Sequence, residues 1–142
     1  DKGFLPSNKI PELFNLIRKK YVDCDIFVDS KKKNLSCYKN CFIKINEKEY
    51  QKASSTIDSS NKVIITLGKK GAMYKQKTYP TEKVEIFDVS GAGDTFLASF
   101  VIKYLETKSI ENSIKFANRC AAIVVKKTGT YALTQSDVQE LV

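Results

Sequence analysis

Hydrophobic positions at the start of the chain recur with the spacing of a helix. Between Ser7 and about Tyr21 they lie three and four residues apart, which is typical of an amphipathic helix. Ser7 or Asn8 is expected to cap this helix, and Pro11 falls in its first turn, where a missing N–H costs nothing. The apolar positions expected to face the core are Ile10, Leu13, Phe14, Ile17 and Tyr21.

Shorter apolar runs farther along the chain predict strands, and two longer patterns predict helices. Strands are expected at 26–28, 42–46 and 63–67, with a polar helix at 47–53. The segments 72–75 and around 79–87 are expected to form a hairpin or meander. Helices are expected from Asp94 to about Glu106, from Ile110 to about Lys126 and, in a last short piece, from Ser136. Strands that alternate with helices indicate an α/β fold with a mainly parallel sheet. Without a repeat or an obvious linker, residues 1–142 are expected to form a single domain.

The composition is that of a globular protein. Of the 142 residues, 42% are hydrophobic and 28% are charged, which is too apolar for a disordered chain. No eighteen apolar residues run together, and the N-terminus lacks the order of a signal peptide. We therefore expect a soluble, cytoplasmic protein with no membrane partner. The chain opens on Asp1 with no initiator Met and no leading strand, so we expect a piece of something longer.

The net charge of 24 − 16 = +8 has two interpretations. It could mark a nucleic-acid binder, or lysines such as Lys31, Lys32 and Lys33 could simply cover solvated surface. Because Arg18 and Arg119 are the only arginines and no nucleic-acid module fits, we expect no nucleic-acid partner; an anionic small substrate suits the same charge. The absence of histidine excludes mechanisms that need an imidazole base.

The four cysteines are expected to be free thiols. No pair has the Cys-x-x-Cys spacing, and without histidine a structural zinc site would need all four of them. Nothing else in the sequence points to secretion, where disulfides are common. They are Cys24, Cys37, Cys41 and Cys120.

The segment 87–96 carries the clearest chemistry. A segment with the pattern of a strand precedes a Gly-Ala-Gly turn at 91–93, and a long helix follows the turn. Successive backbone N–H groups in such a turn can form an anion nest, and the helix N-terminus adds the positive end of its dipole. Asp94 stands beside these donors, where it could take a proton from a hydroxyl that attacks a phosphoryl group. A Walker loop is absent, and Phe96 stands where a dinucleotide fingerprint would need glycine.

The run Asp-Val-Ser-Gly-Ala-Gly-Asp-Thr-Phe at 88–96 resembles the C-terminal signature of the ribokinase-like (PfkB) carbohydrate kinases. The segment Thr66–Gly71 is similar to that family's Thr-Leu-Gly-x-x-Gly nucleotide segment, and Asn46–Glu49 is similar to its Asn-x-x-Glu motif. The helix around Phe116–Asn118, with Ala121 and Ala122, resembles the helix that borders the adenine. The resemblance covers nearly the whole chain but only the C-terminal half of such a kinase.

This resemblance implies roles for single residues and a need for ATP, Mg²⁺ and, in many members, a monovalent cation such as K⁺. Asp94 would be the catalytic base, and the amides of Gly91, Ala92 and Gly93 would form the anion hole. Asn46 and Glu49 would arrange the magnesium-bound phosphates, mostly through water, while Thr66, Gly68, Gly71 and Asn118 would line the ATP site. The cation site would use Asp88 and the Ser90 carbonyl, with backbone oxygens near Val124, Lys127 and Gly129.

Each of these segments also has a purely structural interpretation. Asn46–Glu49 could be a polar strand end, Thr66–Gly68 an ordinary strand stop and Asn118 a satisfied core amide. Asp88 could bond to its own turn. Asp94 could merely cap its helix.

Within the family, Val28–Lys31 and Lys127–Thr130 resemble heptose-7-phosphate kinases, the kinase part of ADP-heptose synthases that supply precursors of the lipopolysaccharide core. There the first segment reads Val-Asp-Pro-Lys, so Ser30 departs from it. The resemblance implies a sugar or sugar-phosphate substrate, and an N-terminal half that would hold the sugar and is absent from this chain. An inactive nucleotide-binding fragment or scaffold of the same fold remains the alternative, and monomer and homodimer both stay open.

Overall fold

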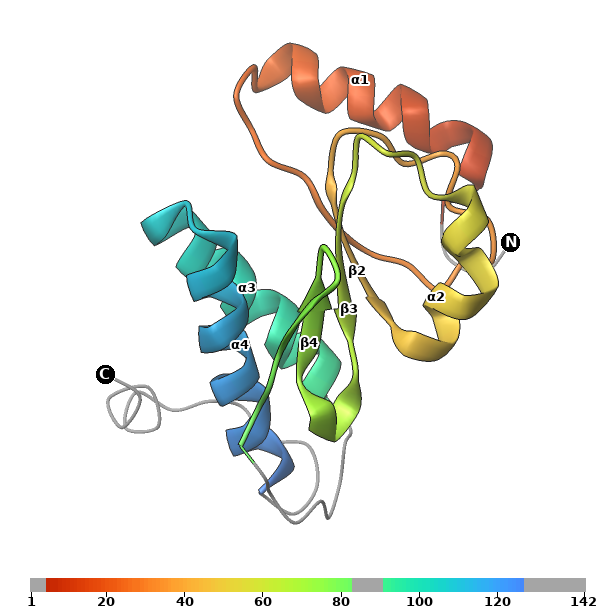
Figure 1. The fold of residues 1–142 in the computed structure, drawn as a ribbon. Coiled ribbons are helices and arrows are strands. Elements are labelled where there is room, and N and C mark those ends of the chain that lie inside the picture. Colours follow the sequence, from red (N-terminus) through yellow and green to blue (C-terminus); the bar gives the residue numbers. More distant parts are fainter. Residues whose placement is uncertain (1–4, 83–90, 127–142) are drawn as a thin grey trace. The chain divides into compact units, whose positions relative to one another are not determined.

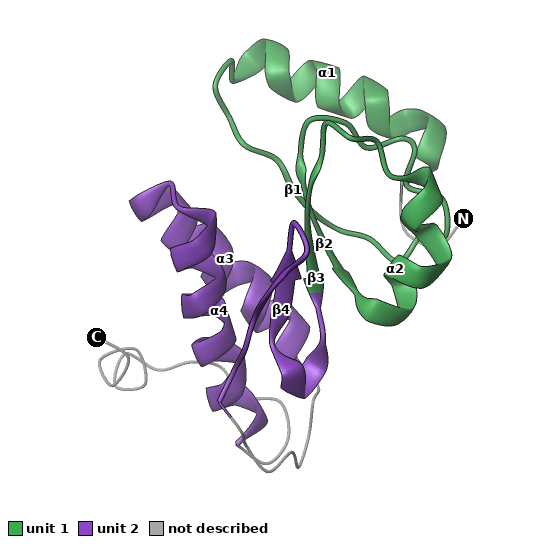
Figure 2. Ribbon diagram, in the orientation of Figure 1, with its two compact units in different colours: residues 1–65 green, residues 66–142 purple. Residues whose placement is uncertain are grey.

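The computed structural model describes residues 5–82 and 91–126. The chain divides into two compact units, residues 1–65 and 66–142 (Figure 2). The short helix expected from Ser136 and the part of the expected meander beyond residue 82 lie outside the described residues. The expectation of a single domain stays a prediction.

The first unit combines short strands with helices (Figure 1). β1 and β2 pair in parallel with Phe27 opposite Phe42, whose rings stack at 4.7 Å, and β3 lies next to β2 in the strand order. The core is formed by apolar side chains of β2 and β3 together with Leu35 and Tyr38 from the preceding loop. In chain order the elements are the 3₁₀ turn Ser7–Lys9, α1 (Ile10–Lys20), β1 (Phe27–Asp29), β2 (Phe42–Asn46), α2 (Glu47–Ala53), the 3₁₀ turn Ser54–Thr56 and β3 (Lys62–Thr66).

Helix α1 confirms the predicted helix but begins later than expected. The chain first forms a 3₁₀ turn, so Lys9 occupies the N-cap position without a side-chain cap bond, and the prediction of Ser7 or Asn8 as the cap is wrong. Pro11 lies within the first turn, as predicted.

The helix buries a narrower stripe than its sequence pattern suggested. Ile10 and Phe14 are buried, and the Phe14 ring lies 6.0 Å from Tyr38, whereas Leu13 and Tyr21 remain 41% and 57% exposed. Spacing alone therefore overestimated how much of the helix faces the core.

Lys32 departs from the expectation that residues 31–33 form a solvated lysine run. Lys31 and Lys33 are exposed on a loop, but Lys32 is buried, and its backbone N–H donates to Ser30 Oγ at 3.2 Å. The loop after β1 turns inward at Lys32, so this lysine is buried although both of its neighbours are exposed. The number of charged residues in a segment does not reveal such a turn.

The second unit contains a β-hairpin and two long helices. β4 (Ala72–Tyr74) and β5 (Lys77–Tyr79) pair antiparallel in a hairpin. This confirms the first predicted arm, whereas β5 ends at Tyr79, where the second predicted arm was expected to begin. The hairpin's turn residues Lys75 and Gln76 both have positive φ, as a two-residue hairpin turn that matches strand twist requires. The 3₁₀ turn Gly68–Lys70 precedes the hairpin, and α3 (Ala92–Thr107) and α4 (Ile110–Val125) confirm the two predicted helices. None of the helices in the described ranges is both long and apolar enough for a membrane crossing.

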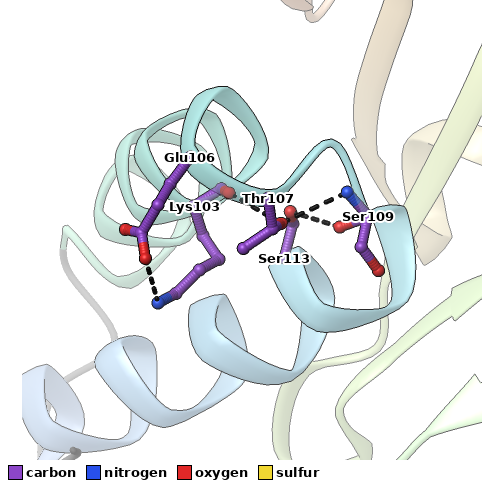
Figure 3. Close-up of polar contacts among 5 residues, drawn as sticks. All are labelled: Lys103, Glu106, Thr107, Ser109 and Ser113. Carbon is purple, nitrogen blue, oxygen red and sulfur yellow. Dashed lines mark hydrogen bonds and ion pairs between the residues drawn. The ribbon is translucent and has the colours of Figure 1, made fainter.

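A short turn connects α3 to α4, and hydrogen bonds of side-chain hydroxyl groups stabilise this turn (Figure 3). Thr107 Oγ1 donates to the Lys103 carbonyl at 2.9 Å and accepts from the Ser109 N–H at 3.2 Å. Ser113 Oγ donates to the Ser109 carbonyl at 2.6 Å, and Lys103 Nζ lies 3.5 Å from Glu106 Oε1. These local bonds shape the turn between α3 and α4, and the two helices pack against each other in the second unit.

Candidate functional site

The N-terminus of α3 is built on a glycine. Gly91 is the N-cap with φ 79° and ψ −9°, a left-handed conformation that residues with a Cβ adopt only at a cost. Its carbonyl accepts from the Thr95 N–H at 2.9 Å, which closes the first turn. The N–H groups of Ala92, Gly93 and Asp94 belong to that first turn and have no carbonyl partner four residues earlier within the helix. The helix itself therefore supplies no acceptor for these three backbone donors.

Helices α2 and α4, unlike α3, have an N-cap side chain that accepts a hydrogen bond from a backbone N–H of the first turn. In α4 the Ser109 Oγ accepts from the Asn112 N–H at 3.2 Å, and in α2 the Asn46 Oδ1 accepts from the Glu49 N–H at 2.8 Å. Gly91 has no side chain that could fill the same role at α3. A bound anion can complete these donors instead, with support from the helix dipole.

Asp94 lies in the first turn of α3 with its side chain exposed. The carboxylate is accessible, and it stands on the same turn as the amide donors of Ala92 and Gly93. Such an arrangement can hold a phosphoryl group and accept a proton from a hydroxyl brought to it. Asp88, Ser90, Lys127 and Gly129, expected at the cation site, lie outside the described residues.

The two glycines after β3 differ in their surroundings. Gly68, with φ +62°, has no atom within 4 Å of the place where a Cβ would stand, so it faces open space. Gly71, with φ +100°, is buried, and a Cβ there would lie 2.1 Å from the Tyr79 carbonyl oxygen and 2.9 Å from the Thr81 nitrogen. Thr66, the last residue of β3, is half-buried beside this turn in sequence. The space beside Gly68 is thus open, while Gly71 allows the main chain to pass close to the end of β5.

Asn118 reaches the same carbonyl from α4. Its side chain is buried, and Nδ2 donates to the Tyr79 oxygen at 2.9 Å. The Asn118 backbone oxygen accepts from Thr81 Oγ1 at 3.3 Å. Gly71 and Asn118, both expected at the ATP site, therefore converge on the end of β5. Sequence reasoning missed Tyr79 and Thr81, because no local signal joins residues 37 to 39 positions apart in the chain.

Asn46 and Glu49 lie in the first unit and form a capping box. Glu49 Oε2 accepts from the Asn46 N–H at 3.0 Å, reciprocal to the bond from the Glu49 N–H to Asn46 Oδ1. The spacing that suggested a phosphate role thus has a structural use at the start of α2. The bond occupies one carboxylate oxygen of Glu49, so a water-mediated role for the other is chemically compatible.

The cysteines are free thiols, and burial dominates their chemistry. Burial raises the pKa of Cys41 to about 11, and Cys41 Sγ lies 3.4 Å from Asn61 Oδ1. Burial also raises the pKa of Cys37 and of Cys120. These thiols are poor nucleophiles near neutral pH.

The sequence and the fold of this chain are similar to those of known proteins. Residues 39–137 match the model of the pfkB family carbohydrate kinase. The bifunctional protein HldE of Aliarcobacter butzleri is 31% identical over 160 residues, covering 98% of this chain and 33% of the relative. A ribokinase from Thermotoga maritima superposes with a TM-score of 0.70 and 26% identity, covering 94% of this chain and 54% of that one. Phosphofructokinase-2 from Escherichia coli, solved in complex with potassium, shares the fold with a TM-score of 0.81 at 20% identity, covering 96% and 52%.

These likenesses also set the extent of the match. The chain spans a third or less of the curated relatives and about half of the solved kinases. The superpositions confirm the expected ribokinase-like α/β fold. With the family model matched over residues 39–137 and a relative matched along nearly the whole chain, this chain belongs to the pfkB family of carbohydrate kinases.

Proposed function

We propose that this chain is the nucleotide-binding and catalytic part of an ATP-dependent kinase that phosphorylates a sugar hydroxyl. The observation that carries the proposal is the N-terminus of α3, where a glycine cap leaves backbone donors for an anion and an exposed Asp94 stands among them. Phosphoryl transfer needs these two elements, a positive cradle for the transferring group and a base for the attacking hydroxyl.

In the proposed reaction Asp94 takes the hydroxyl proton as the sugar oxygen forms its bond to the γ-phosphorus of ATP. The bond between that phosphorus and the bridging oxygen breaks, and ADP leaves with the electron pair. The amides of Gly91, Ala92 and Gly93 stabilise the charge on the phosphoryl oxygens. Donors fixed in a helix end need no reorganisation as this charge develops.

The nucleotide is proposed to lie over the turn after β3, against Thr66 and Gly68. The open space above Gly68 supports this placement. Gly71 and Asn118 both lie close to the Tyr79 carbonyl. We propose that they support the nucleotide site mainly by fixing the position of this carbonyl, rather than by direct contact with the nucleotide.

Metal ions enter the proposal through two sets of residues. Asn46 and Glu49 are proposed to orient the magnesium-bound phosphates through water, and Mg²⁺ would there offset the phosphate charge. Asp88 and the Ser90 carbonyl are proposed to bind a monovalent cation. The potassium complex of the Escherichia coli phosphofructokinase-2, a protein of the same fold, prompts the choice of K⁺.

The acceptor is proposed to be a sugar phosphate, specifically heptose 7-phosphate. The resemblance of Val28–Lys31 to the heptose kinases supports it, together with the HldE relatives. The sugar is proposed to be held mainly by the part of the kinase fold that this chain does not span. Alone the chain would then bind nucleotide weakly and turn over little, because nothing orients the hydroxyl or excludes water.

The Asp94→Asn substitution in the complete kinase tests the role of the base. We expect kcat to fall at least about a hundredfold, the usual cost of a lost general base. Glu106→Gln is the matched control, an exposed carboxylate at the far end of the same helix, and it should leave kcat unchanged. A near-wild-type rate for Asp94→Asn would remove this residue from the mechanism.

The amide cradle can be tested on the 142-residue chain by NMR. Magnesium-ATP at millimolar concentration should shift the amide signals of residues 91–94. The signals of residues 110–112 serve as the control, because the Ser109 side chain already caps that helix. Shifts in residues 91–94 without phosphoryl transfer by the complete kinase would favour the inactive nucleotide-binding alternative. Signals that stay unchanged would show that no anion site forms at α3.

A further inference from the structure

Ser99 is a polar residue in the buried side of α3. The helix buries the side chains of Phe96, Ser99 and Phe100, and Ser99 is only 4% exposed. Its hydroxyl donates to the Thr95 carbonyl at 2.6 Å, one turn closer to the N-terminus of the helix. A buried hydroxyl needs such a partner, so the bond has a structural explanation. Its place in the helix gives it a second consequence.

The backbone hydrogen bonds of an α-helix form rows along its axis. Each N–H donates to the carbonyl four residues earlier, and that carbonyl belongs to the same planar peptide group as the N–H of the next residue. The Thr95 carbonyl thus shares its peptide group with the Phe96 N–H. In α3 the Phe96 N–H pairs with the Ala92 carbonyl, whose peptide group contains the Gly93 N–H. The row that the Ser99 hydroxyl joins therefore ends on Gly93.

The Gly93 N–H is one of the first-turn donors for which the helix supplies no acceptor. A donor added to a row of hydrogen bonds polarises the bonds that follow, by roughly 10–30% for each bond. The N–H groups of Ala92 and Asp94 end two other rows, and neither row contains the Thr95 carbonyl. The Ser99 hydroxyl therefore acts on a single donor of the candidate anion site.

Helix α4 shields this hydroxyl from water. Burial raises the pKa of the Cys120 thiol, and a hydrogen bond with the Ser99 side chain partly offsets the rise. Cys120 is itself fully buried on α4, so the Ser99 hydroxyl lies at the contact between the two helices. Where water is excluded, a hydrogen bond polarises its neighbours more strongly than at the surface.

We propose that Ser99 is a positioning residue of the kinase, which makes the Gly93 amide a stronger donor to the transferring phosphoryl group. It acts through the peptide groups of the row and needs no contact with substrate. A stronger fixed donor stabilises the charge that develops on the phosphoryl oxygens during transfer. The inference rests on the proposed function for the anion that Gly93 binds, whereas the effect on the Gly93 N–H is measurable without a ligand.

Ser113 on α4 provides a matched control. It is buried, and its hydroxyl donates to the Ser109 carbonyl at the same distance of 2.6 Å (Figure 3). This carbonyl shares its peptide group with the Ile110 N–H, in the first turn of α4, which has no part in the proposed reaction. An alanine at either position removes the same kind of bond from a buried place, but only the row of Ser99 leads to the candidate site.

The first measurement is the amide NMR spectrum of the 142-residue chain without ligand. Ser99→Ala should shift the Gly93 signal more than the signals of Ala92 and Asp94. Ser113→Ala should shift the Ile110 signal and leave Gly93 unchanged. An unchanged Gly93 signal in Ser99→Ala would overturn the proposal. Equal shifts at residues 92–94 would also overturn it, because a first turn that merely loosens moves all three signals.

The second measurement is the kinetics of the complete kinase with the same substitutions. We expect Ser99→Ala to lower kcat about two- to fivefold with the KM for ATP unchanged, since the strengthened donor acts on charge that develops in the transition state. Ser113→Ala should keep the wild-type kcat. A wild-type kcat in Ser99→Ala, or an equal loss in Ser113→Ala, would overturn the proposal. A wild-type kinase that transfers no phosphate would instead refute the proposed function, and the NMR result would still show whether Ser99 acts on Gly93.

Discussion

Replacing Gly71 by alanine tests whether this glycine is required by the fold. Its backbone has φ +100° and ψ −131°, a region that residues with a side chain rarely adopt. A Cβ would also stand 2.1 Å from the Tyr79 oxygen and 2.9 Å from the Thr81 nitrogen, both main-chain atoms that cannot rotate away. The hairpin end would have to move for the alanine to fit.

The size of the effect follows from these two strains. The backbone conformation costs about 1–3 kcal/mol for a residue with a Cβ. The overlap adds about 1–3 kcal/mol, as for an overpacked core. The smaller entropy of the unfolded alanine chain offsets about 0.4–1 kcal/mol. The net loss is therefore about 1–5.6 kcal/mol, which corresponds to a fall in Tm of about 3–22 °C for a chain of this length.

Gly68→Ala is the matched control, and thermal unfolding followed by circular dichroism is the assay. Gly68 shares the positive φ but has no atom within 4 Å of the added methyl group, so its loss should be about 1 kcal/mol or less. We expect Gly71→Ala to lower Tm clearly more than Gly68→Ala. Equal Tm values for the two variants would refute the close approach of Gly71 to Tyr79.

Two further predictions concern buried polar groups. Asn118→Leu keeps the number and branching of the side-chain heavy atoms but removes the donor to the Tyr79 carbonyl, so it should destabilise the chain by about 1–3 kcal/mol in urea unfolding, whereas the exposed Asn112→Ala should not. An unchanged free energy of unfolding would show that the bond contributes nothing. Cys41, whose pKa burial raises from about 9 to about 11, should be alkylated at pH 8 about a hundredfold more slowly in the folded chain than in the unfolded chain, because the thiolate fraction falls with the pKa shift. Mass spectrometry of the labelled thiols would detect equal rates, which would contradict the burial of Cys41.

The linear pattern of residues was sufficient for the local elements. Alternation and β-branching located β2, and the polar run after it located α2, with the same bounds as in the structure. The two long helices and the first strand of the hairpin were also predicted, and the bounds of the helices moved by two residues or fewer. These elements depend on side-chain periodicity and on turn residues a few positions apart, which a sequence displays directly. The glycine-rich start of α3 could also be predicted, because it is a local sequence pattern.

The tertiary structure alone decided which residues of a pattern meet a distant partner. It buried Lys32 within an otherwise exposed lysine run, left Leu13 in water and gave Gly68 and Gly71 different surroundings. It also joined Asn118 to a carbonyl 39 residues away. Burial and long-range hydrogen bonds depend on which segments the folded chain brings together, and residue order carries no direct record of that contact. The sequence therefore determined the elements and the chemistry they offer, while packing determined which side chains support the site and which face solvent.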